Sequence, residues 1–117
     1  MTKKVLTVSP NDPIRKAIKL MDDKNIGSLI VASDNEPVGI ITERDIIRRV
    51  LIKNKDLDVT FVRSVMTSKV HTVDITSTFV EVTKMMIRNN IRRVVVTKNK
   101  KIAGILTAYD VVRFMAN

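Results

Sequence analysis

The chain has 117 residues, of which 21 are Lys or Arg and 12 are Asp or Glu, and its formal net charge is +9. At 44% hydrophobic it is too apolar for intrinsic disorder, and the absence of cysteine excludes disulfides and thiolate metal sites. No apolar run approaches the roughly 18 residues that a membrane-spanning helix requires, so we expect a cytoplasmic protein that does not enter the membrane. The lack of glutamine, together with many Ile, Val and Lys residues, is typical of a thermophilic source.

The first half of the chain is predicted to run strand, helix, strand, strand, helix. A short β-branched run precedes Asp12 and Pro13, an oxygen cap followed by a residue suited to the first helical turn. Apolar residues then recur at the spacing of one helix face, and we expect Gly27 to end that helix. Two continuous apolar runs follow, joined by a turn at 33–37. The predicted elements are strands 5–8, 29–32 and 38–42, and helices from 13 to about 24 and from about 43 onward.

The second half of the chain repeats the first. A shift of 65 residues aligns residues 1–52 with residues 66–117 without a gap and gives 16 identities, which indicates a duplicated unit. The elements predicted for the second half are strands 70–73, 93–97 and 102–107, and helices 78–89 and 108–116. We therefore expect an α/β fold of two tandem β-α-β-β-α repeats packed face to face. The expected boundaries are 1–55 for the first repeat, 56–65 for a linker and 66–117 for the second repeat.

The third strand of each repeat ends in the same pattern, Gly-x-x-Thr-x-x-Asp. The pattern consists of Gly39, Thr42 and Asp45 in the first repeat and of Gly104, Thr107 and Asp110 in the second. A glycine lets a flat ligand approach the backbone, and a Thr hydroxyl stands at the helix N-terminus. An Asp carboxylate can accept two hydrogen bonds from the vicinal diol of a ribose. A helix cap made by the Thr and the Asp is the structural alternative, although two copies at matching places favour a ligand site.

The ordered set of motifs resembles the cystathionine β-synthase (CBS) domain. The segment 62–67 leads into the second repeat, and two tandem copies resemble a Bateman module over essentially the whole chain. The first repeat begins at Met1 and Thr2, so its lead-in is expected to be missing. The resemblance implies a non-catalytic sensor, with no required cofactor, that binds an adenosine-containing ligand such as AMP, ADP, ATP or S-adenosylmethionine. It also implies that the ligand lies in clefts between two repeats related by pseudo-twofold symmetry.

The resemblance further implies roles for individual residues. The aspartate of each pattern would hold the ribose, and the threonine would lie beside the ribose or the phosphates. In similar proteins, basic residues at the start of a strand in the partner repeat meet the phosphates. These are Arg92 and Arg93 for the Asp45 cleft, whereas Arg44 could serve the Asp110 cleft. We therefore expect unequal sites, with the phosphate favoured at Asp45; a solvated strand start is the alternative for the two arginines.

The positive charge supports a second functional hypothesis, nucleic-acid binding through the phosphate backbone. Residues 1–65 contain 12 basic and 9 acidic residues, whereas residues 66–117 contain 9 basic and 3 acidic ones. A basic cluster surrounds one predicted strand and its turn, a pattern that phosphate contacts would use. The cluster consists of Arg88, Arg92, Arg93, Lys98, Lys100 and Lys101. Only 3% of the residues are aromatic, so base stacking is minimal and this function is the alternative.

The remaining expectations concern catalysis and protein partners. No Ser–His–Asp arrangement, glycine-rich phosphate loop or carboxylate cluster occurs, so we do not expect an enzyme. The sequence shows no output domain, so such a sensor is expected either to act on an unidentified effector protein or to be a stand-alone sensor. The resemblance implies a homodimer, because paired modules of this family commonly associate through their helices, and apolar rows on the last helix of each repeat could supply the surface. The rows consist of Ile46, Ile47, Val50 and Leu51, and of Val111, Val112 and Met115.

Overall fold

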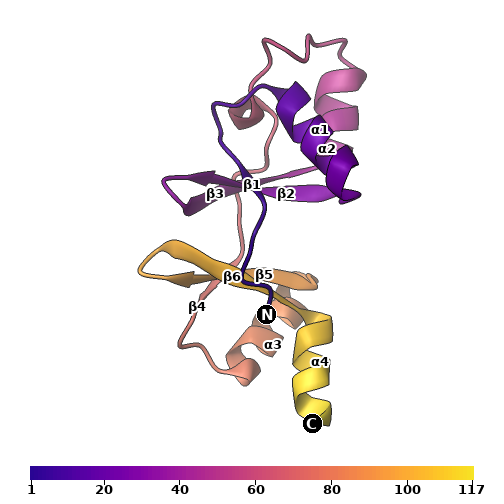
Figure 1. Cartoon of the computed structure of the whole chain (residues 1–117). Coiled ribbons are helices and arrows are strands. Elements are labelled where there is room, and N and C mark those ends of the chain that lie inside the picture. The colour runs from indigo at the N-terminus through magenta and orange to yellow at the C-terminus, as the bar shows by residue number, and fades with distance from the viewer. The chain divides into compact units, whose positions relative to one another are not determined.

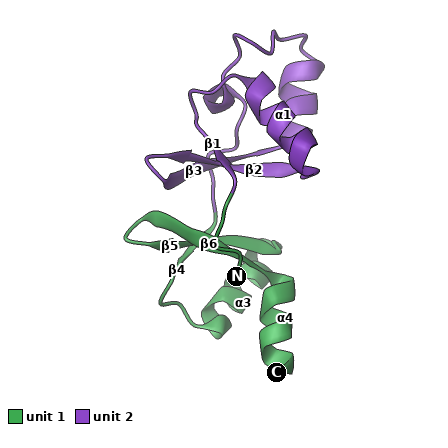
Figure 2. Ribbon diagram, viewed as in Figure 1, with its two compact units in different colours: residues 1–5, 71–117 green, residues 6–70 purple.

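The computed structural model describes residues 1–117 and contains two three-stranded sheets, each with its own pair of helices (Figure 1). The order β-α-β-β-α occurs twice, which confirms the predicted α/β fold of two tandem repeats. The chain divides into two compact units (Figure 2). Unit 2 comprises Leu6–Val70, and unit 1 comprises His71–Asn117 together with Met1–Val5. Each unit is therefore built around one repeat.

Unit 2 contains a mixed sheet in the order β1-β2-β3, with β1 parallel and β3 antiparallel to β2. Both of its helices lie on one face of this sheet (Figure 1). The helix α2 continues into a π-helical turn, η1, and a short 3-10 turn, η2, lies in the segment between the repeats. The elements are β1 (Thr7–Val8), α1 (Ile14–Lys24), β2 (Ser28–Ser33), β3 (Glu36–Thr42), α2 (Glu43–Ile46), η1 (Ile47–Leu51) and η2 (Val62–Ser64).

Unit 1 repeats this arrangement, with β4 parallel and β6 antiparallel to the central strand β5. The helices α3 and α4 again cover one face of the sheet (Figure 1). A continuous helix, α4, here occupies the place of α2 and η1. The elements are β4 (Thr72–Asp74), α3 (Phe79–Asn89), β5 (Arg93–Lys98), β6 (Lys101–Thr107) and α4 (Ala108–Ala116).

The first helix of each unit ends at an asparagine. Asn25 and Asn90 adopt the left-handed conformation, with φ of 52° and 51°, and their N–H groups bond the last carbonyls of α1 and α3. Asparagine tolerates this conformation better than most residues do, and it satisfies carbonyls that the helix leaves free. The expectation that Gly27 ends the helix is therefore wrong, because Gly27 lies beyond this cap and has a negative φ.

The core of each unit lies between its sheet and its helices. In unit 2 the side chains of Ile14, Val31, Ile41 and Val50 are completely buried. Val62 is also completely buried in this core, so the segment between the repeats is part of unit 2. The core of unit 1 is smaller. It consists of Val73, Val82, Met86, Val94, Val96 and Val111.

Each sheet receives one further backbone pairing at the start of a repeat. Thr67 pairs with Ile40 of β3 through bonds of 2.8 and 2.9 Å, and Thr2 pairs with Ile105 of β6 through bonds of 3.0 and 2.8 Å. The two threonines occupy the same place in the duplicated sequence, yet each joins the sheet of the other repeat. The N-terminal segment therefore belongs to unit 1 (Figure 2).

Candidate functional site

The pattern Gly-x-x-Thr-x-x-Asp lies in each unit where the last strand of the sheet passes into the following helix. In unit 2, Asp45 Oδ2 accepts a hydrogen bond from the Thr42 N–H at 3.1 Å, and Thr42 Oγ1 accepts one from the Asp45 N–H at 3.1 Å. This reciprocal pair is a capping box, which satisfies two N–H groups that the helix leaves free. The carboxylate is thereby held in one orientation and keeps its second oxygen for other contacts.

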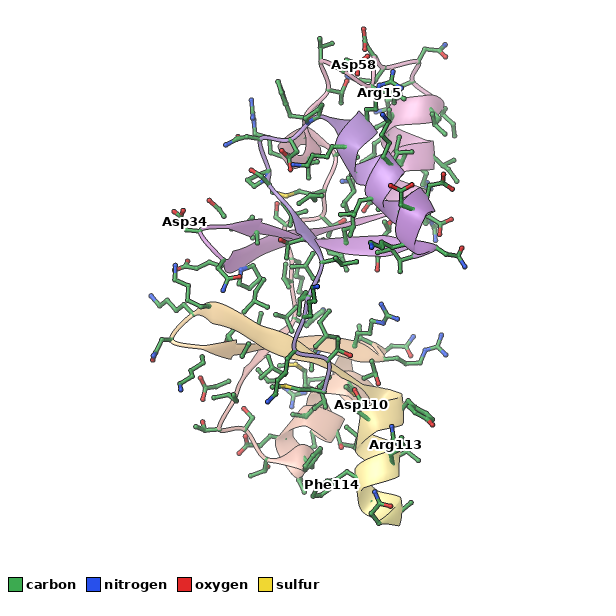
Figure 3. The ribbon with its side chains drawn as sticks, viewed as in Figure 1. Arg15, Asp34, Asp58, Asp110, Arg113 and Phe114 are labelled. Carbon is green, nitrogen blue, oxygen red and sulfur yellow. The ribbon has the colours of Figure 1, made fainter.

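The same capping box occurs in unit 1. The Thr107 N–H donates to Asp110 Oδ2 at 3.0 Å, and the Asp110 N–H donates to Thr107 Oγ1 at 3.1 Å. The bond from the Thr107 N–H holds the pKa of Asp110 below its ordinary value; burial opposes this shift, while the Thr107 hydroxyl, the chain's terminal ammonium group and Arg113 add to it. Figure 3 shows Asp110 at the start of α4, with Arg113 one turn further on. The carboxylate is therefore an ionised acceptor at neutral pH.

The surroundings of the two carboxylates differ. Asp45 Oδ1 lies 3.5 Å from the Thr67 hydroxyl, which donates to it, and 4.0 Å from Arg49 Nε. Arg49 also donates from Nη1 to the carbonyl oxygens of Val65 and Met66, at 2.8 and 3.2 Å. The residue that corresponds to Arg49 in unit 1 is Phe114, which cannot make these contacts. The structure thus gives the two carboxylates different neighbours, whereas the prediction of unequal ligand sites stays a prediction.

Thr67 and Arg49 were missed as neighbours of the candidate site. Thr67 carried a signal, because it is one of the identities between the repeats, but it follows Asp45 by 22 residues and so is not adjacent to the motif in sequence. Arg49 carried none, because its position holds phenylalanine in the second repeat. The π-helical turn η1 shifts the residues after Ile46, so Arg49 reaches Val65 while Val50 enters the core.

The two glycines of the pattern lie against the chain itself. A Cβ atom at Gly39 would lie 2.6 Å from Met66 Sδ and 3.0 Å from the Thr67 carbonyl oxygen. A Cβ atom at Gly104 would lie 2.7 Å from the Thr2 carbonyl oxygen. The absence of a side chain at each glycine therefore gives the backbone of Thr67 and Thr2 room to pair with β3 and β6, which is a structural reason for this residue type. Contact of either glycine with a flat ligand stays a prediction.

The candidate basic residues lie on the surface of the two units. Arg92 and Arg93 are exposed where β5 begins; Arg93 is the register partner of Thr107, and the Arg92 carbonyl accepts from the Ala108 N–H at 2.9 Å. The structure thus places both arginines in unit 1, beside its own motif. Arg44 is exposed on α2 of unit 2. The assignments of these arginines to ligand phosphates stay predictions.

The structure contains neither a candidate metal-binding group nor a candidate membrane-spanning helix. No group of three or more His, Cys, Asp or Glu side chains is placed to hold a metal ion. None of the helices combines the length and the apolar character needed to cross a membrane.

Comparison with known proteins places this geometry in a family. The chain is 35% identical over 130 aligned residues to the uncharacterized protein MJ1404 of Methanocaldococcus jannaschii, an alignment that covers 100% of this chain but 31% of that protein. The fold of the present chain matches that of the CBS domain pair of protein MJ0100, whose structure contains 5'-methylthioadenosine and S-adenosyl-L-methionine. The TM-score is 0.76 at 29% identity, over 99% of this chain and 91% of the other.

A third similar structure is the hexameric CBS-CP12 protein from bloom-forming cyanobacteria, with a TM-score of 0.73 and 29% identity over 96% of this chain and 63% of that one. The CBS domain matches residues 1–52 and 62–117, which are the two repeats found by the shift of 65 residues together with residues 62–65 ahead of the second. The chain belongs to the CBS domain family, as a tandem pair of CBS domains.

Proposed function

We propose that this chain is a non-catalytic regulatory module that binds an adenosine-containing small molecule at the Gly-x-x-Thr-x-x-Asp motifs. The observation that carries the proposal is the pair of carboxylates, Asp45 and Asp110, each fixed by a capping box at the same place in its unit. A fixed, ionised carboxylate suits the two hydroxyl groups of a ribose, because it accepts two hydrogen bonds without having to be ordered on binding. The adenosine ligands in the structure of the MJ0100 domain pair support this ligand class.

The capping boxes leave acceptor capacity for a ligand. In each box the Asp side chain uses Oδ2 for the helix cap, so Oδ1 remains for further hydrogen bonds. Asp45 Oδ1 already has a weak contact with the Thr67 hydroxyl at 3.5 Å, which a ribose hydroxyl could replace. The threonine and the aspartate therefore serve the helix and the ligand together, and the two explanations of the motif are compatible.

The two sites are proposed to differ in affinity. Asp45 has Arg49 near its carboxylate, and the sequence further predicts that Arg92 and Arg93 meet the phosphates of its ligand. Asp110 has Arg113 as a cationic neighbour, but Phe114 occupies the position that corresponds to Arg49. We expect phosphorylated ligands to favour Asp45.

The proposal includes a protein partner for this module. Several apolar side chains remain at least half exposed on the last helix of each unit. They are Ile47 and Leu51 of η1, and Val112, Phe114 and Met115 of α4. We propose that these surfaces form a homodimer or contact an effector protein; the hexameric CBS-CP12 structure supports assembly within the family.

A thermal-shift titration tests the ligand proposal. The full chain is titrated with AMP, ADP, ATP and S-adenosylmethionine, and at about 100 times its Kd a ligand raises the unfolding free energy by roughly 2.7 kcal/mol. Asp45→Ala and Asp110→Ala are each expected to remove one site. Glu81→Ala is the matched control, because it removes the hydrogen bond from the Thr78 N–H to the Glu81 carboxylate in the capping box of α3, and neither residue belongs to a ligand motif. No shift with any of the four ligands at millimolar concentration would refute the proposal.

A further inference from the structure

Arg49 joins the motif of unit 2 to residues 65–67, the segment that follows η2. Its Nη1 donates to the carbonyl oxygens of Val65 and Met66 at 2.8 and 3.2 Å, and its Nε lies 4.0 Å from Asp45 Oδ1. The planar guanidinium presents its N–H donors in a fixed arrangement, so one group can bond in two directions at once. Arg49 therefore contacts both this segment and the carboxylate proposed to hold the ribose.

The segment 65–67 lies directly against the motif. Thr67 pairs with Ile40 through two backbone bonds, and its hydroxyl donates to Asp45 Oδ1 at 3.5 Å. The Met66 sulfur packs against Gly39, where an added Cβ would lie 2.6 Å from it. The capping box uses Oδ2 of the aspartate and leaves Oδ1 for a ligand. The position of the segment therefore decides which groups surround the oxygen that a ligand would use.

The segment depends on Arg49 for two of its hydrogen bonds. The N–H groups of Val65 and Met66 both bond the Val62 carbonyl, at 3.0 and 2.9 Å, whereas no backbone N–H bonds the carbonyls of Val65 and Met66. Val65 is 2% exposed, and a buried polar group without a partner is costly. Without Arg49 the segment would have to shift until water or another donor reached these carbonyls.

The backbone of η1 holds Arg49 in place. The next residue, Val50, is completely buried in the core of unit 2, which fixes this turn of the helix. A π-helical turn such as η1 is rare, and such turns occur frequently at functional sites. Unit 1 has a regular α-helix at the corresponding place. The irregular turn and the arginine thus occur together in unit 2.

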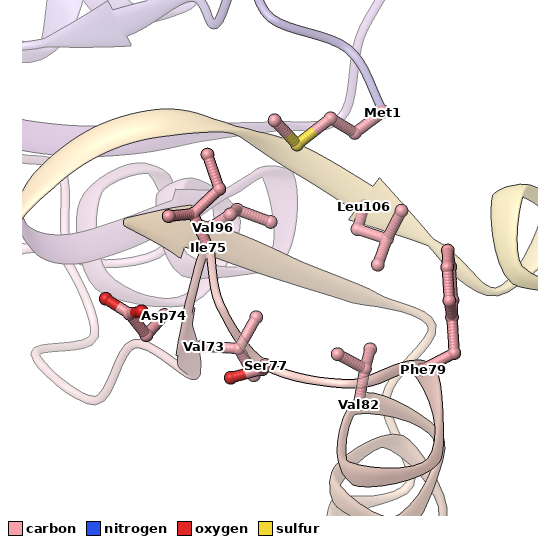
Figure 4. A pocket seen from close by; sticks show the side chains of 9 residues that line it. All are labelled: Met1, Val73, Asp74, Ile75, Ser77, Phe79, Val82, Val96 and Leu106. Atoms are coloured by element: carbon pink, nitrogen blue, oxygen red, sulfur yellow. The ribbon is translucent and has the colours of Figure 1, made fainter. Parts of the chain in front are cut away.

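The side chain that corresponds to Arg49 in unit 1 has a different role. Phe114 stacks on Phe79 of α3, with ring centroids 4.0 Å apart and 18° between the planes. Phe79 in turn lines a cavity of about 250 Å³, and the residues that line this cavity do not include Thr107 or Asp110 (Figure 4). Phe114 therefore packs against the first helix of unit 1 and not against its motif.

We propose that Arg49 is a positioning residue for the site at Asp45 and couples ligand binding there to residues 65–67. The inference rests on the proposed function, because it concerns the site assigned to the adenosine ligand. Arg49 holds the segment beside Asp45 Oδ1, so a ligand does not have to order it on binding. Such coupling is reciprocal in free energy, so the bound ligand in turn holds the segment more firmly. Occupancy of the site is thereby passed to the part of the chain that enters unit 1 at His71.

A direct bond from Arg49 to a ligand phosphate is the competing explanation. Nη1 of Arg49 already donates to two carbonyls, which favours the positioning role. Adenosine, which has the ribose but no phosphate, separates the two explanations. Positioning affects the binding of adenosine and AMP equally, whereas a phosphate contact affects AMP alone.

Calorimetric titration of the full chain with adenosine and with AMP provides the test. All variants carry Asp110→Ala, so that the site at Asp45 alone is titrated. Arg49→Met is expected to weaken both ligands by the same factor, about five-fold or more, which is the lower end of usual couplings. Arg48→Met is the matched control, because Arg48 is exposed in the same turn and carries the same charge but bonds neither the segment nor Asp45. It should bind both ligands as the parent chain does.

Hydrogen exchange in the original chain provides a second readout that needs no variant. Saturating adenosine should raise the protection of the amides of Ile40 and Thr67 by a larger factor than that of the core strand β2. A purely structural role of Arg49 would not produce this dependence on the ligand. In a folded Arg49→Met chain the additional protection should be lost.

The outcomes separate this inference from the proposed function. If the original chain binds neither adenosine nor AMP at millimolar concentration, the proposed function itself is refuted. Once binding is observed, equal affinities of Arg49→Met and Arg48→Met, a loss confined to AMP, or binding that disappears entirely with Asp110→Ala would each overturn the positioning role. If circular dichroism shows that Arg49→Met or Asp110→Ala does not fold, hydrogen exchange decides, and unchanged protection of Ile40 and Thr67 overturns the proposal.

Discussion

Gly39→Ala tests whether the pairing of Thr67 with β3 holds unit 2 together. The added Cβ would lie 2.6 Å from Met66 Sδ and 3.0 Å from the Thr67 carbonyl oxygen. The methionine can move, but the carbonyl is fixed by its bond from the Ile40 N–H at 2.9 Å. The contact is relieved only if Thr67 moves away from β3. This movement weakens the two backbone hydrogen bonds between Thr67 and Ile40, each worth about 1 kcal/mol. With overpacking costs of about 1–3 kcal/mol in other cores, we expect a loss of about 1–3 kcal/mol.

Gly27→Ala is the matched substitution. A Cβ atom there would lie 2.5 Å from Glu43 Oε1, the end of a flexible and exposed side chain that can rotate away. None of the glycines has a positive φ, so alanine introduces no backbone strain at either position. Alanine also restricts the unfolded chain, which stabilises a protein by about 0.4–1 kcal/mol. Gly27→Ala should therefore be neutral or slightly stabilising.

Urea unfolding, followed by circular dichroism, measures both changes. Unit 2 has the size of a small domain, for which about 1 kcal/mol shifts the melting temperature by roughly 4–8 °C. Hydrogen exchange adds a local readout, because the amides of Ile40 and Thr67 should lose protection in Gly39→Ala alone. Equal stability of the two variants would refute the reasoning, since both lengthen a glycine by the same methyl group.

Three further predictions concern the core of unit 2, the pH dependence of stability and the positive charge. Val62→Ala should lower the free energy of unfolding by about 2 kcal/mol, measured in urea, because Val62 is completely buried in the core of unit 2. Val59→Ala, at an exposed position, should have little effect. Equal losses in the two variants would contradict the contribution of Val62 to this core. The pKa of Asp110 is lowered, so its contribution to stability is present above the ordinary Asp pKa and is lost as the pH falls through the lowered value. Asp110→Asn should therefore be less stable than the original chain at pH 7, with a difference that shrinks in acid; a constant difference would contradict this. Any binding of oligonucleotides should weaken steeply between low and moderate salt in a gel-shift assay, and insensitivity to salt would contradict binding through phosphates.

Much of the fold could be predicted because the duplication shows the sequence pattern of each strand and helix twice. The capping boxes at Thr42 and Thr107 were foreseen as the structural alternative for the motif, and both form. The helix ends were harder. Gly27 was expected to end the first helix. Instead, α1 and α3 end at Asn25 and Asn90, which are identical between the repeats and adopt the left-handed conformation. Identity across the repeats was the better signal.

The turns between the paired strands were also tighter than predicted. A turn at 33–37 was expected, yet β2 and β3 are joined at Asp34 and Asn35, both with positive φ. Pro37 lies within β3, next to the irregularity in its pairing with β2. Proline is compatible with a strand at such a bulge, so it did not mark the end of the turn.

The features that the sequence did not reveal depend on long-range contacts. Periodicity does not indicate that Thr2 joins β6 and Thr67 joins β3, because the pairing lies between segments of opposite repeats. From the sequence, the two motif glycines were therefore explained only by contact with a ligand. In the structure each glycine also leaves room for the backbone of Thr67 or Thr2.

The proposed function is tested most directly by a crystal structure of the chain grown with AMP or S-adenosylmethionine at millimolar concentration. The account predicts a ligand whose ribose hydroxyls lie within hydrogen-bond distance of the carboxylate of Asp45 or Asp110. A ligand bound elsewhere on the chain, or crystals in which both carboxylates are accessible and neither holds a ribose, would contradict it.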